Sequence, residues 1–404
     1  MNKREIPFSP PHITEKEIEA VVDALRSGWI TTGPKTKLFE EKLAEYCNTE
    51  RFVTMNSATA AMEMTLRLLG VGPGDEVITS AYTYTASASV IHHVGAKIVL
   101  VDIQDDKPEM DYDKLADAIT EKTKVIIPVD IAGIMCDYDR IFEVVESKKH
   151  LFKPDSELQD AFGRVVVMAD AAHSLGAKYK GKMSGEVADF TAFSCHAVKN
   201  LTTAEGGGVT WRPVPGINSN DIYQEYMLLS LHGQSKDALA KNQPGAWEYD
   251  IIAPNYKCNM TDIQASLGLV QLERYEDILK IRENIVKTYN RGLDQLDNLH
   301  YLVHDFEENR SSYHLYFMRI DGINEKERNE IIIKLAEQGI STNVHYKPLP
   351  LLTAYKNLGF NIENYPKAFN YYQNEITLPL NSKMSLEDAE YVVSEIRKIL
   401  DVKP

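Results

Sequence analysis

The sequence has little that would suggest a secreted or metal-binding protein. Its 404 residues include only four cysteines, and no two of them have Cys-x-x-Cys spacing. Such cysteines fit reduced thiols in the cytoplasm better than a disulfide framework or a zinc site. The first residues also lack the apolar core of a signal peptide, and no uninterrupted apolar stretch reaches transmembrane length. We therefore expect a cytoplasmic protein without a metal site.

Positive charge is also scarce. Lysine and arginine number 44 against 59 aspartates and glutamates, which gives a net charge of −15. Basic side chains bind nucleic acid by releasing its counterions, and they also attract anionic membranes. An acidic surface offers neither effect, so neither nucleic acid nor a membrane is expected as a partner. A phosphorylated small molecule stays possible because it needs only a local cradle of donors. The length suits a large domain with a smaller companion.

Apolar strands alternate with amphipathic helices over the first half of the chain. We expect strands at 51–55, 77–80, 97–102, 124–129, 164–170, 189–193 and 208–211, and helices at 36–47, 56–69, 111–120 and 139–150. This alternation predicts a mostly parallel sheet covered on both faces, which is an α/β fold. Residues 151–163 are polar and predict an irregular surface insertion.

The two ends of the chain give further signals. Thr14 should cap a first helix and form a capping box with Glu17, and Gly28 should end it. The apolar face expected for this helix consists of Ile18, Val21, Val22 and Leu25. A single long helix over 261–297 should lead into a smaller α+β domain with strands at 313–320 and 341–345 and helices at 325–338 and 385–400. We place the large domain at 1–260, including an N-terminal segment 1–35, and the bridging helix and small domain at 261–404.

Lys199 is the first candidate for chemistry. It lies among small and apolar residues in Ser194–Asn200, without an acidic residue within five positions, and a glycine run follows at 206–208. A solvated lysine usually has polar neighbours, so this one suggests an amine held in a pocket and able to form a Schiff base. The alternative is a structural lysine whose stem packs while its amine reaches water.

Two further side chains follow predicted strands. Asp170 ends the buried strand 164–170, and Tyr84 follows the strand 77–80 at the start of a helix. Ligands bind outside the carboxyl ends of parallel strands, so both positions favour a ligand site. Each also has a plain structural explanation, since Asp170 could cap the next segment and Tyr84 could be a core aromatic.

Small hydroxyl residues open the helix at 56–69. Ser57-Ala58-Thr59 could hold a phosphate on free backbone N–H groups, although simple capping of the helix explains them as well. Taken with Lys199, Asp170 and Tyr84, they complete the set that pyridoxal phosphate needs: a lysine, a carboxylate for the pyridine nitrogen, a flat side chain and a phosphate site.

Several stretches resemble the DegT family of sugar-nucleotide aminotransferases, which have the type I (aspartate-aminotransferase) fold. The matching stretches, which span nearly the whole chain, are 27–34, 56–62, 72–79, 169–173, 194–200, 204–207 and 344–348. The resemblance is nearest to enzymes that aminate UDP-linked 4-keto sugars, such as those making 4-amino-4-deoxy-arabinose. It implies pyridoxal 5′-phosphate as cofactor. It also implies transfer of an amino group from L-glutamate, which leaves as 2-oxoglutarate, to a nucleotide-sugar used in surface glycan or lipopolysaccharide biosynthesis.

The same resemblance implies roles for individual residues. Lys199 would be the Schiff-base lysine, Asp170 would face the pyridine nitrogen and Tyr84 would stack on the ring. The other residues implied around the cofactor are Ser57, Ala58, Thr59, His173 and Ser194. Substrate contacts are expected from Thr31, His196, His345 and Tyr346.

Family members are homodimers in which the neighbouring subunit completes each site. The loop that does so matches Asn255–Asn259, and either Lys257 or Asn259 would reach the phosphate of the partner's cofactor. Two departures from the family pattern stand out: Cys195 replaces an aromatic residue, and the segment 147–163 is longer than usual.

Alternatives stay open at this point. The acceptor could be a dTDP- or GDP-linked sugar, or a 3-keto sugar. A sugar 3-dehydratase of the same family would have histidine in place of Lys199. A non-catalytic regulatory protein on the same fold is the alternative from a different class.

Overall fold

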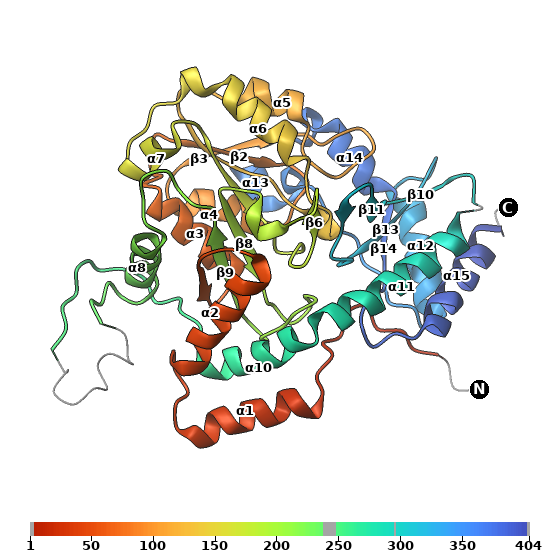
Figure 1. Ribbon diagram of the computed structural model, residues 1–404. Helices are drawn as coiled ribbons and strands as arrows, with labels where there is room; N and C mark the ends of the chain where they lie inside the picture. The colour runs from red at the N-terminus through yellow and green to blue at the C-terminus, as the bar shows by residue number, and fades with distance from the viewer. Residues whose placement is uncertain (1–3, 237–247, 295, 402–404) are drawn as a thin grey trace.

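A seven-stranded sheet forms the centre of the chain. The computed structural model describes residues 4–236, 248–294 and 296–401 (Figure 1). The strands lie in the order β1-β9-β8-β5-β4-β2-β3, and only β9 is antiparallel to its neighbours. Their bounds are β1 Phe52–Met55, β2 Glu76–Ser80, β3 Lys97–Val101, β4 Thr123–Ile127, β5 Val166–Asp170, β8 Phe190–Ser194 and β9 Gly207–Trp211. The predicted, mostly parallel α/β sheet is confirmed.

Helices cover both faces of this sheet because its strands are apolar on both sides. Along β2, Val77 and Ile78 belong to two different clusters of buried side chains. One cluster includes α3 (Ala58–Leu68), α4 (Ala86–His93) and α8 (Ser219–Ser230), and the other includes α2 (Pro34–Cys47), α5 (Tyr112–Ala118) and α6 (Tyr138–Ser147). The continuous apolar runs of the strands are thus explained by a layer of helices on each side. None of the helices in the described ranges is long and apolar enough to cross a membrane.

The first helix, α1 (Glu15–Ser27), has the predicted capping box, and its apolar face lies largely on the surface of the chain. Ile18 and Leu25 are 47% and 52% exposed, whereas Glu17 is fully buried. The Glu17 carboxylate turns inward because it accepts hydrogen bonds from Arg274 Nε at 2.7 Å and from Gln271 Nε2 at 2.7 Å. This buried polar contact holds α1 against α10 (Figure 1), and the apolar stripe faces outward.

The single helix expected over 261–297 is in fact two, α10 (Asp262–Glu273) and α11 (Tyr275–Leu293). The break is at Arg274, whose backbone leaves helical geometry with φ −110° and ψ 16°. Its guanidinium binds Glu17 and the carbonyl oxygen of His12. This contact with the N-terminal segment fixes Arg274 at the corner, which helical periodicity alone did not reveal.

The C-terminal part is built on a three-stranded antiparallel sheet of β10 (Leu299–Tyr301), β13 (Tyr316–Ile320) and β14 (Glu375–Leu378). Helices α11, α12 (Glu325–Glu337) and α15 (Leu386–Asp401) enclose a third apolar cluster with it. The strand expected at 341–345 does not form, and Asn343 makes only an isolated bridge to Thr377. The His345 N–H donates to the Glu375 carboxylate at 2.9 Å. Because this N–H is bonded to a side chain, the backbone pairing with β14 does not continue past Asn343.

The segment expected to be irregular, 151–163, contains the helix α7 (Glu157–Phe162). Ser156 caps it, and Gln159 is fully buried with its amide bonded to the Leu69 carbonyl at 2.8 Å. These buried polar contacts order a segment whose composition suggested only a surface loop. The remaining elements are β6 Lys178–Tyr179, β7 Lys182–Met183, β11 Asp305–Phe306, β12 Asn309–Arg310, α13 Thr353–Asn357 and α14 Pro366–Gln373.

Candidate active site

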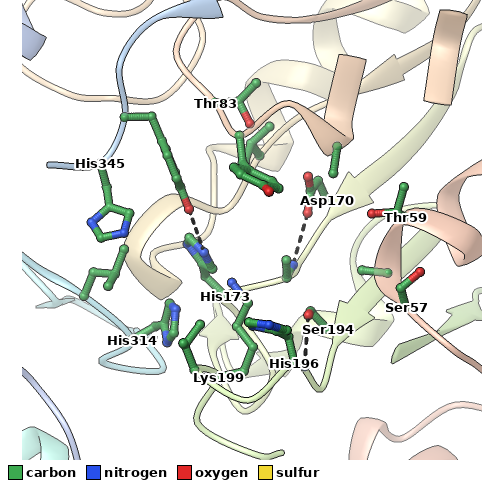
Figure 2. Close-up of a pocket in the computed structure, with 18 of the residues that line it drawn as sticks. Ser57, Thr59, Thr83, Asp170, His173, Ser194, His196, Lys199, His314 and His345 are labelled. Atoms are coloured by element: carbon green, nitrogen blue, oxygen red, sulfur yellow. Dashed lines mark hydrogen bonds between the residues drawn. The ribbon is translucent and has the colours of Figure 1, made fainter. Parts of the chain in front are cut away.

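A cavity of about 530 Å³ lies outside the carboxyl ends of the parallel strands. Its walls come from the start of α3, the β2–α4 corner, the end of β5 and the loop after β8, and on the other side from residues 314–315 and 343–346. Figure 2 shows Ser57 and Thr59 at one end, His345 and His314 at the other, and Asp170 and Lys199 between them. The cavity therefore brings together residues of the large sheet and of the C-terminal part.

Lys199 enters the cavity from the loop that follows β8. Its backbone N–H donates to the His196 carbonyl at 2.9 Å, and the Cys195 N–H donates to the Gly206 carbonyl at 2.9 Å, so the loop is anchored at its base. The amine makes no hydrogen bond with any residue of the described ranges. Burial lowers the pKa of Lys199 to about 8, although the Asp170 carboxylate opposes the shift. A lysine amine in this state is a nucleophile near neutral pH.

Asp170 is buried at the end of β5. Its Oδ2 accepts a hydrogen bond from the Ser87 hydroxyl at 2.6 Å, and its Oδ1 accepts one from the Ala172 N–H at 3.2 Å. Burial raises the pKa of Asp170, while these two hydrogen bonds and the charge of Lys199 act in the opposite direction. No lysine or arginine of the described residues is bonded to this buried carboxylate, so it fits a protonated pyridine nitrogen, which would supply the missing positive charge.

His173 follows Asp170 and is held by the β4–α6 connection. Its Nδ1 lies 3.2 Å from the Ala132 N–H, which only donates, so the ring proton resides on Nε2. That nitrogen lies 3.1 Å from the Tyr346 hydroxyl. Burial holds the pKa of His173 well below its usual value, with Lys199 adding to the effect. The ring is therefore neutral and donates to Tyr346.

The opposite end of the cavity fits a phosphate. Ser57 caps α3 by accepting the Ala60 N–H at 3.0 Å, and Ala58 and Thr59 in the first turn line the cavity together with Ser194. N–H groups of a first helical turn have no partner within the helix and favour an anion. The helix start lies directly on β9, since a Cβ at Gly207 would come within 2.4 Å of the Ala58 nitrogen. The first turn of α3 is thus packed closely against β9, which fixes the position of its N–H groups.

The predicted site residues fall into two groups. Those that line the cavity are Ser57, Ala58, Thr59, Tyr84, Asp170, His173, Ser194, His196, Lys199, His345 and Tyr346. Tyr84 is 60% exposed, and its ring centroid lies 6.0 Å from that of Tyr346. Thr31, Lys257 and Asn259 do not line the cavity of their own chain.

Sequence reasoning missed several residues that line the cavity or hold a residue of its wall. Ser87, which bonds Asp170, lies in a helix with ordinary small residues around it, and Phe8 belongs to the N-terminal segment. Phe8 stacks on the His345 ring at 5.6 Å. His314 lines the cavity from a position two residues before β13 begins. Nothing in the local sequence of these three residues points to a site.

Comparison with known proteins gives a consistent result. A sequence model described as the DegT/DnrJ/EryC1/StrS aminotransferase family matches residues 11–397. The chain is 37% identical to the spore coat polysaccharide biosynthesis protein SpsC of Bacillus subtilis over 98% of this chain and 97% of that protein. It is 35% identical to the UDP-4-amino-4-deoxy-L-arabinose–oxoglutarate aminotransferase of Shewanella sediminis over the full length of both.

Solved structures agree with these relatives. The putative sugar aminotransferase Spr1654 from Streptococcus pneumoniae, in its PMP form, is 60% identical with a TM-score of 0.95, covering 98% of this chain and 99% of that one. PseC of Helicobacter pylori, an aminotransferase involved in the biosynthesis of pseudoaminic acid, is 28% identical with a TM-score of 0.86, covering 99% and 100%.

Proposed function

Because the chain belongs to the DegT/DnrJ/EryC1/StrS aminotransferase family, we propose that it moves the amino group of L-glutamate to the keto group of a nucleotide-linked sugar. The predictions of an aminotransferase, of the type I fold and of pyridoxal 5′-phosphate as cofactor are confirmed. The observation that carries the proposal is the arrangement of Lys199 and Asp170. An amine with a pKa of about 8 and a buried carboxylate without a bonded cation line one cavity.

The residues of the cavity fit the cofactor at each of its parts. Lys199 would hold it covalently, Asp170 would pair with its ring nitrogen, and the first turn of α3 with Ser194 would hold its phosphate. Tyr84 offers an exposed ring for stacking. When bound, pyridoxal phosphate supplies a carbonyl carbon that exchanges the amino group and a ring that withdraws electrons.

Lys199 also moves protons. With a pKa of about 8, its amine exists in both charge states near neutral pH, which suits a group that takes a proton in one step and returns it in the next. We assign it the proton transfer at the reacting carbon of both substrates. Histidine takes the place of this lysine in the sugar 3-dehydratases, so Lys199 favours amino transfer over dehydration.

The acceptor is proposed to be a UDP-linked 4-keto sugar used in surface polysaccharide or lipopolysaccharide biosynthesis in the cytoplasm. The support comes from the Shewanella relative, whose name specifies a UDP-linked 4-amino sugar and which matches over its full length. The Bacillus relative is named for polysaccharide biosynthesis.

We also propose a homodimer with shared sites. Lys199 is the only lysine or arginine among the described residues that line the cavity, yet glutamate and a nucleotide-sugar are both anionic. A second subunit could supply the missing positive charge. Lys257 is a candidate because it is exposed on the chain surface, where its amine bonds only the side chain of Asn259 among the described residues. The outward apolar stripe of α1, with Ile18 and Leu25 about half exposed, offers a surface for such contact.

Subunit mixing tests the shared site. Lys199→Ala and Lys257→Ala homodimers should both be weak, while a mixed dimer should regain one intact site and with it about a quarter to a half of the wild-type rate, by simple counting of sites. A mixture no more active than its parents would show that Lys257 does not act across an interface.

A product assay tests the acceptor. Purified enzyme is supplied with L-glutamate and, in turn, UDP-, dTDP- and GDP-linked 4-keto and 3-keto sugars, and both 2-oxoglutarate and the amino sugar are measured by mass. We expect the highest kcat/KM with a UDP-linked 4-keto sugar. If the enzyme prefers another nucleotide or a 3-keto sugar, the proposed acceptor is wrong. If no sugar leads to formation of 2-oxoglutarate, the non-catalytic alternative is favoured.

A further inference from the structure

His314 is a buried histidine in the cavity wall to which the proposed function gives no role. Its ring lies 4.3 Å from that of His173 between centroids and lines the same cavity as Lys199 (Figure 2). Burial lowers the pKa of His314 well below its usual value, and the neighbouring His173 and Lys199 add to the shift. At neutral pH the ring is uncharged, so one of its nitrogens carries a proton and the other offers a lone pair.

The side chain of Asn200 decides which nitrogen carries the proton. Asn200 Nδ2 donates to the Ser312 carbonyl at 2.7 Å, and its Oδ1 accepts the Arg282 Nε–H at 2.8 Å. An amide oxygen can only accept, and His314 Nδ1 lies 2.9 Å from this oxygen. The proton of the His314 ring is therefore on Nδ1, and Nε2 is the acceptor.

Arg282 fixes this arrangement. The residue is 2% exposed, and its guanidinium donates to the Leu380 carbonyl at 2.6 Å and to the His314 carbonyl at 3.4 Å, in addition to Asn200. The same group thus orients both the backbone of His314 and the amide that faces its ring. Because Asn200 directly follows Lys199 in the chain, the lysine loop and the histidine ring are held by one network.

The acceptor nitrogen of His314 is open to a ligand. Nε2 makes no hydrogen bond with any residue in the described part of the chain. It is also not one of the polar side-chain atoms that are both fully buried and without a hydrogen bond, so a ligand in the cavity can reach it. A ligand at this point must donate a hydrogen bond. The carboxylates of glutamate only accept, and its amino group is the reacting group, whereas a sugar carries hydroxyl groups that donate.

We propose that His314 recognises the hydroxyl group on the carbon next to the keto carbon of the sugar, accepting its hydrogen bond at Nε2. This inference rests on the proposed function. The adjacent carbon is favoured because Lys199 is assigned to the reacting carbon itself and His314 lines the same cavity. His314 is then a residue that selects the second substrate and takes no part in the glutamate reaction.

Two substitutions of His314 test whether its ring binds the sugar or only maintains the fold. The amide of His314→Asn can replace Nδ1 and keep the contact with Asn200, but it does not reach the position of Nε2. The longer His314→Gln can place an amide oxygen near the Nε2 position. Thermal unfolding and the absorbance of the bound cofactor establish that both variants fold and load.

The two half-reactions are then measured separately by stopped-flow absorbance, with L-glutamate and with a UDP-linked 4-keto hexose. Loss of one buried hydrogen bond should lower kcat/KM of His314→Asn for the sugar by about 10- to 100-fold and leave the glutamate half-reaction within about threefold. His314→Gln should recover part of the loss. The 3-deoxy analogue of the sugar should react poorly with the wild type and no worse with His314→Asn.

Calorimetric titration of the glutamate-free enzyme with the same two sugars adds a binding readout, since no amino group is then available for transfer. Equal slowing of both half-reactions in His314→Asn, or unchanged discrimination between the two sugars, would overturn the role of His314 while the aminotransferase function stands. A wild type that aminates no nucleotide-sugar would instead remove the proposed function, and this inference with it.

Discussion

Two buried aspartates at opposite ends of the central sheet are paired very differently. Asp189 lies at the amino end of β8, where its carboxylate binds Arg164 at 2.7 and 2.9 Å, Arg212 at 2.6 Å and the Val167 N–H at 2.9 Å. Asp170, at the carboxyl end of the adjacent β5, receives only a hydroxyl and one backbone N–H. Two arginines pair with the first carboxylate, whereas the second has no cation bonded to it among the described residues, which fits the cationic ligand proposed for it.

The bonded partners of a buried carboxylate, more than its burial, distinguish the two aspartates. Both carboxylates are almost fully buried, so burial alone does not distinguish them. A buried ion pair whose partners are all protein groups contributes to the folded state, and removing one partner leaves an uncompensated charge. A buried charge whose partner is missing destabilises the protein and is retained where a ligand needs it.

The largest effect is expected at the cavity end, from Lys199→Ala. Without the amine, amino transfer should fall by about 10⁴-fold or more, the upper range for a positioned acid–base group. Single-turnover production of 2-oxoglutarate measures the loss, and borohydride should no longer fix the cofactor to the protein. Lys97→Ala, at the amino end of β3, is the matched control and should keep wild-type kinetics. Normal turnover by Lys199→Ala would refute the assignment.

At the other end of the sheet, Asp189→Asn should act on stability alone. It removes the charge that faces two arginines, and the free energy of unfolding should fall by about 3 kcal/mol, near the lower end for a broken buried pair. The lower end is expected because Glu146 still lies 3.2 Å from Arg164. Urea unfolding measures the loss, and the kcat of the folded fraction should be unchanged. A variant with native stability would mean that the ion pairs contribute little.

Asp170→Asn is the counterpart and should show the reverse pattern. Its kcat should fall by about 10²- to 10³-fold, as for loss of one preorganised electrostatic group. The apo protein should be no less stable, because burial already disfavours the charged form and raises the pKa of this carboxyl. Kinetics and urea unfolding of the two aspartate variants, measured side by side, test the comparison directly. If the two variants lost activity and stability to a similar extent, the distinction between the two aspartates would be wrong.

The position of each aspartate at a strand end was predictable, but its partners were not. Asp170 ends a strand, and Tyr84 and Lys199 each follow one. Because the carboxyl ends of parallel strands meet at one edge of the sheet, the convergence of these residues follows from the pattern of strands alone. His314 is held by Asn200 and Arg282, which lie far from it in the chain, and no local pattern reports such contacts. The corner at Arg274 escaped prediction for the same reason, because a tertiary ion pair with Glu17 overrides helical periodicity.

The charge coupling at the cavity end predicts a pH dependence. An amine attacks a carbonyl carbon only in its neutral form, and burial lowers the pKa of Lys199 to about 8. If Lys199 holds the cofactor as proposed, capture of pyridoxal phosphate by the apo protein should accelerate about tenfold per pH unit below 8 and level off above it. Asp170 raises this pKa, and Asp170→Asn should therefore move the midpoint to lower pH. Stopped-flow absorbance measures the rate. A midpoint near that of a free lysine would contradict a buried amine.

The smallest effect separates helix capping from phosphate binding. Ser57 caps α3 inside the cavity, and Ser156 caps α7 outside it, each by accepting a backbone N–H from three residues on. Replacing either by alanine should cost about 1 kcal/mol of stability through the lost cap. Only Ser57→Ala should also weaken cofactor binding, because Ser57 and the first turn of α3 line the cavity. Equilibrium titration of both apo variants with pyridoxal phosphate decides between the two roles, since equal affinities would leave Ser57 as a cap alone.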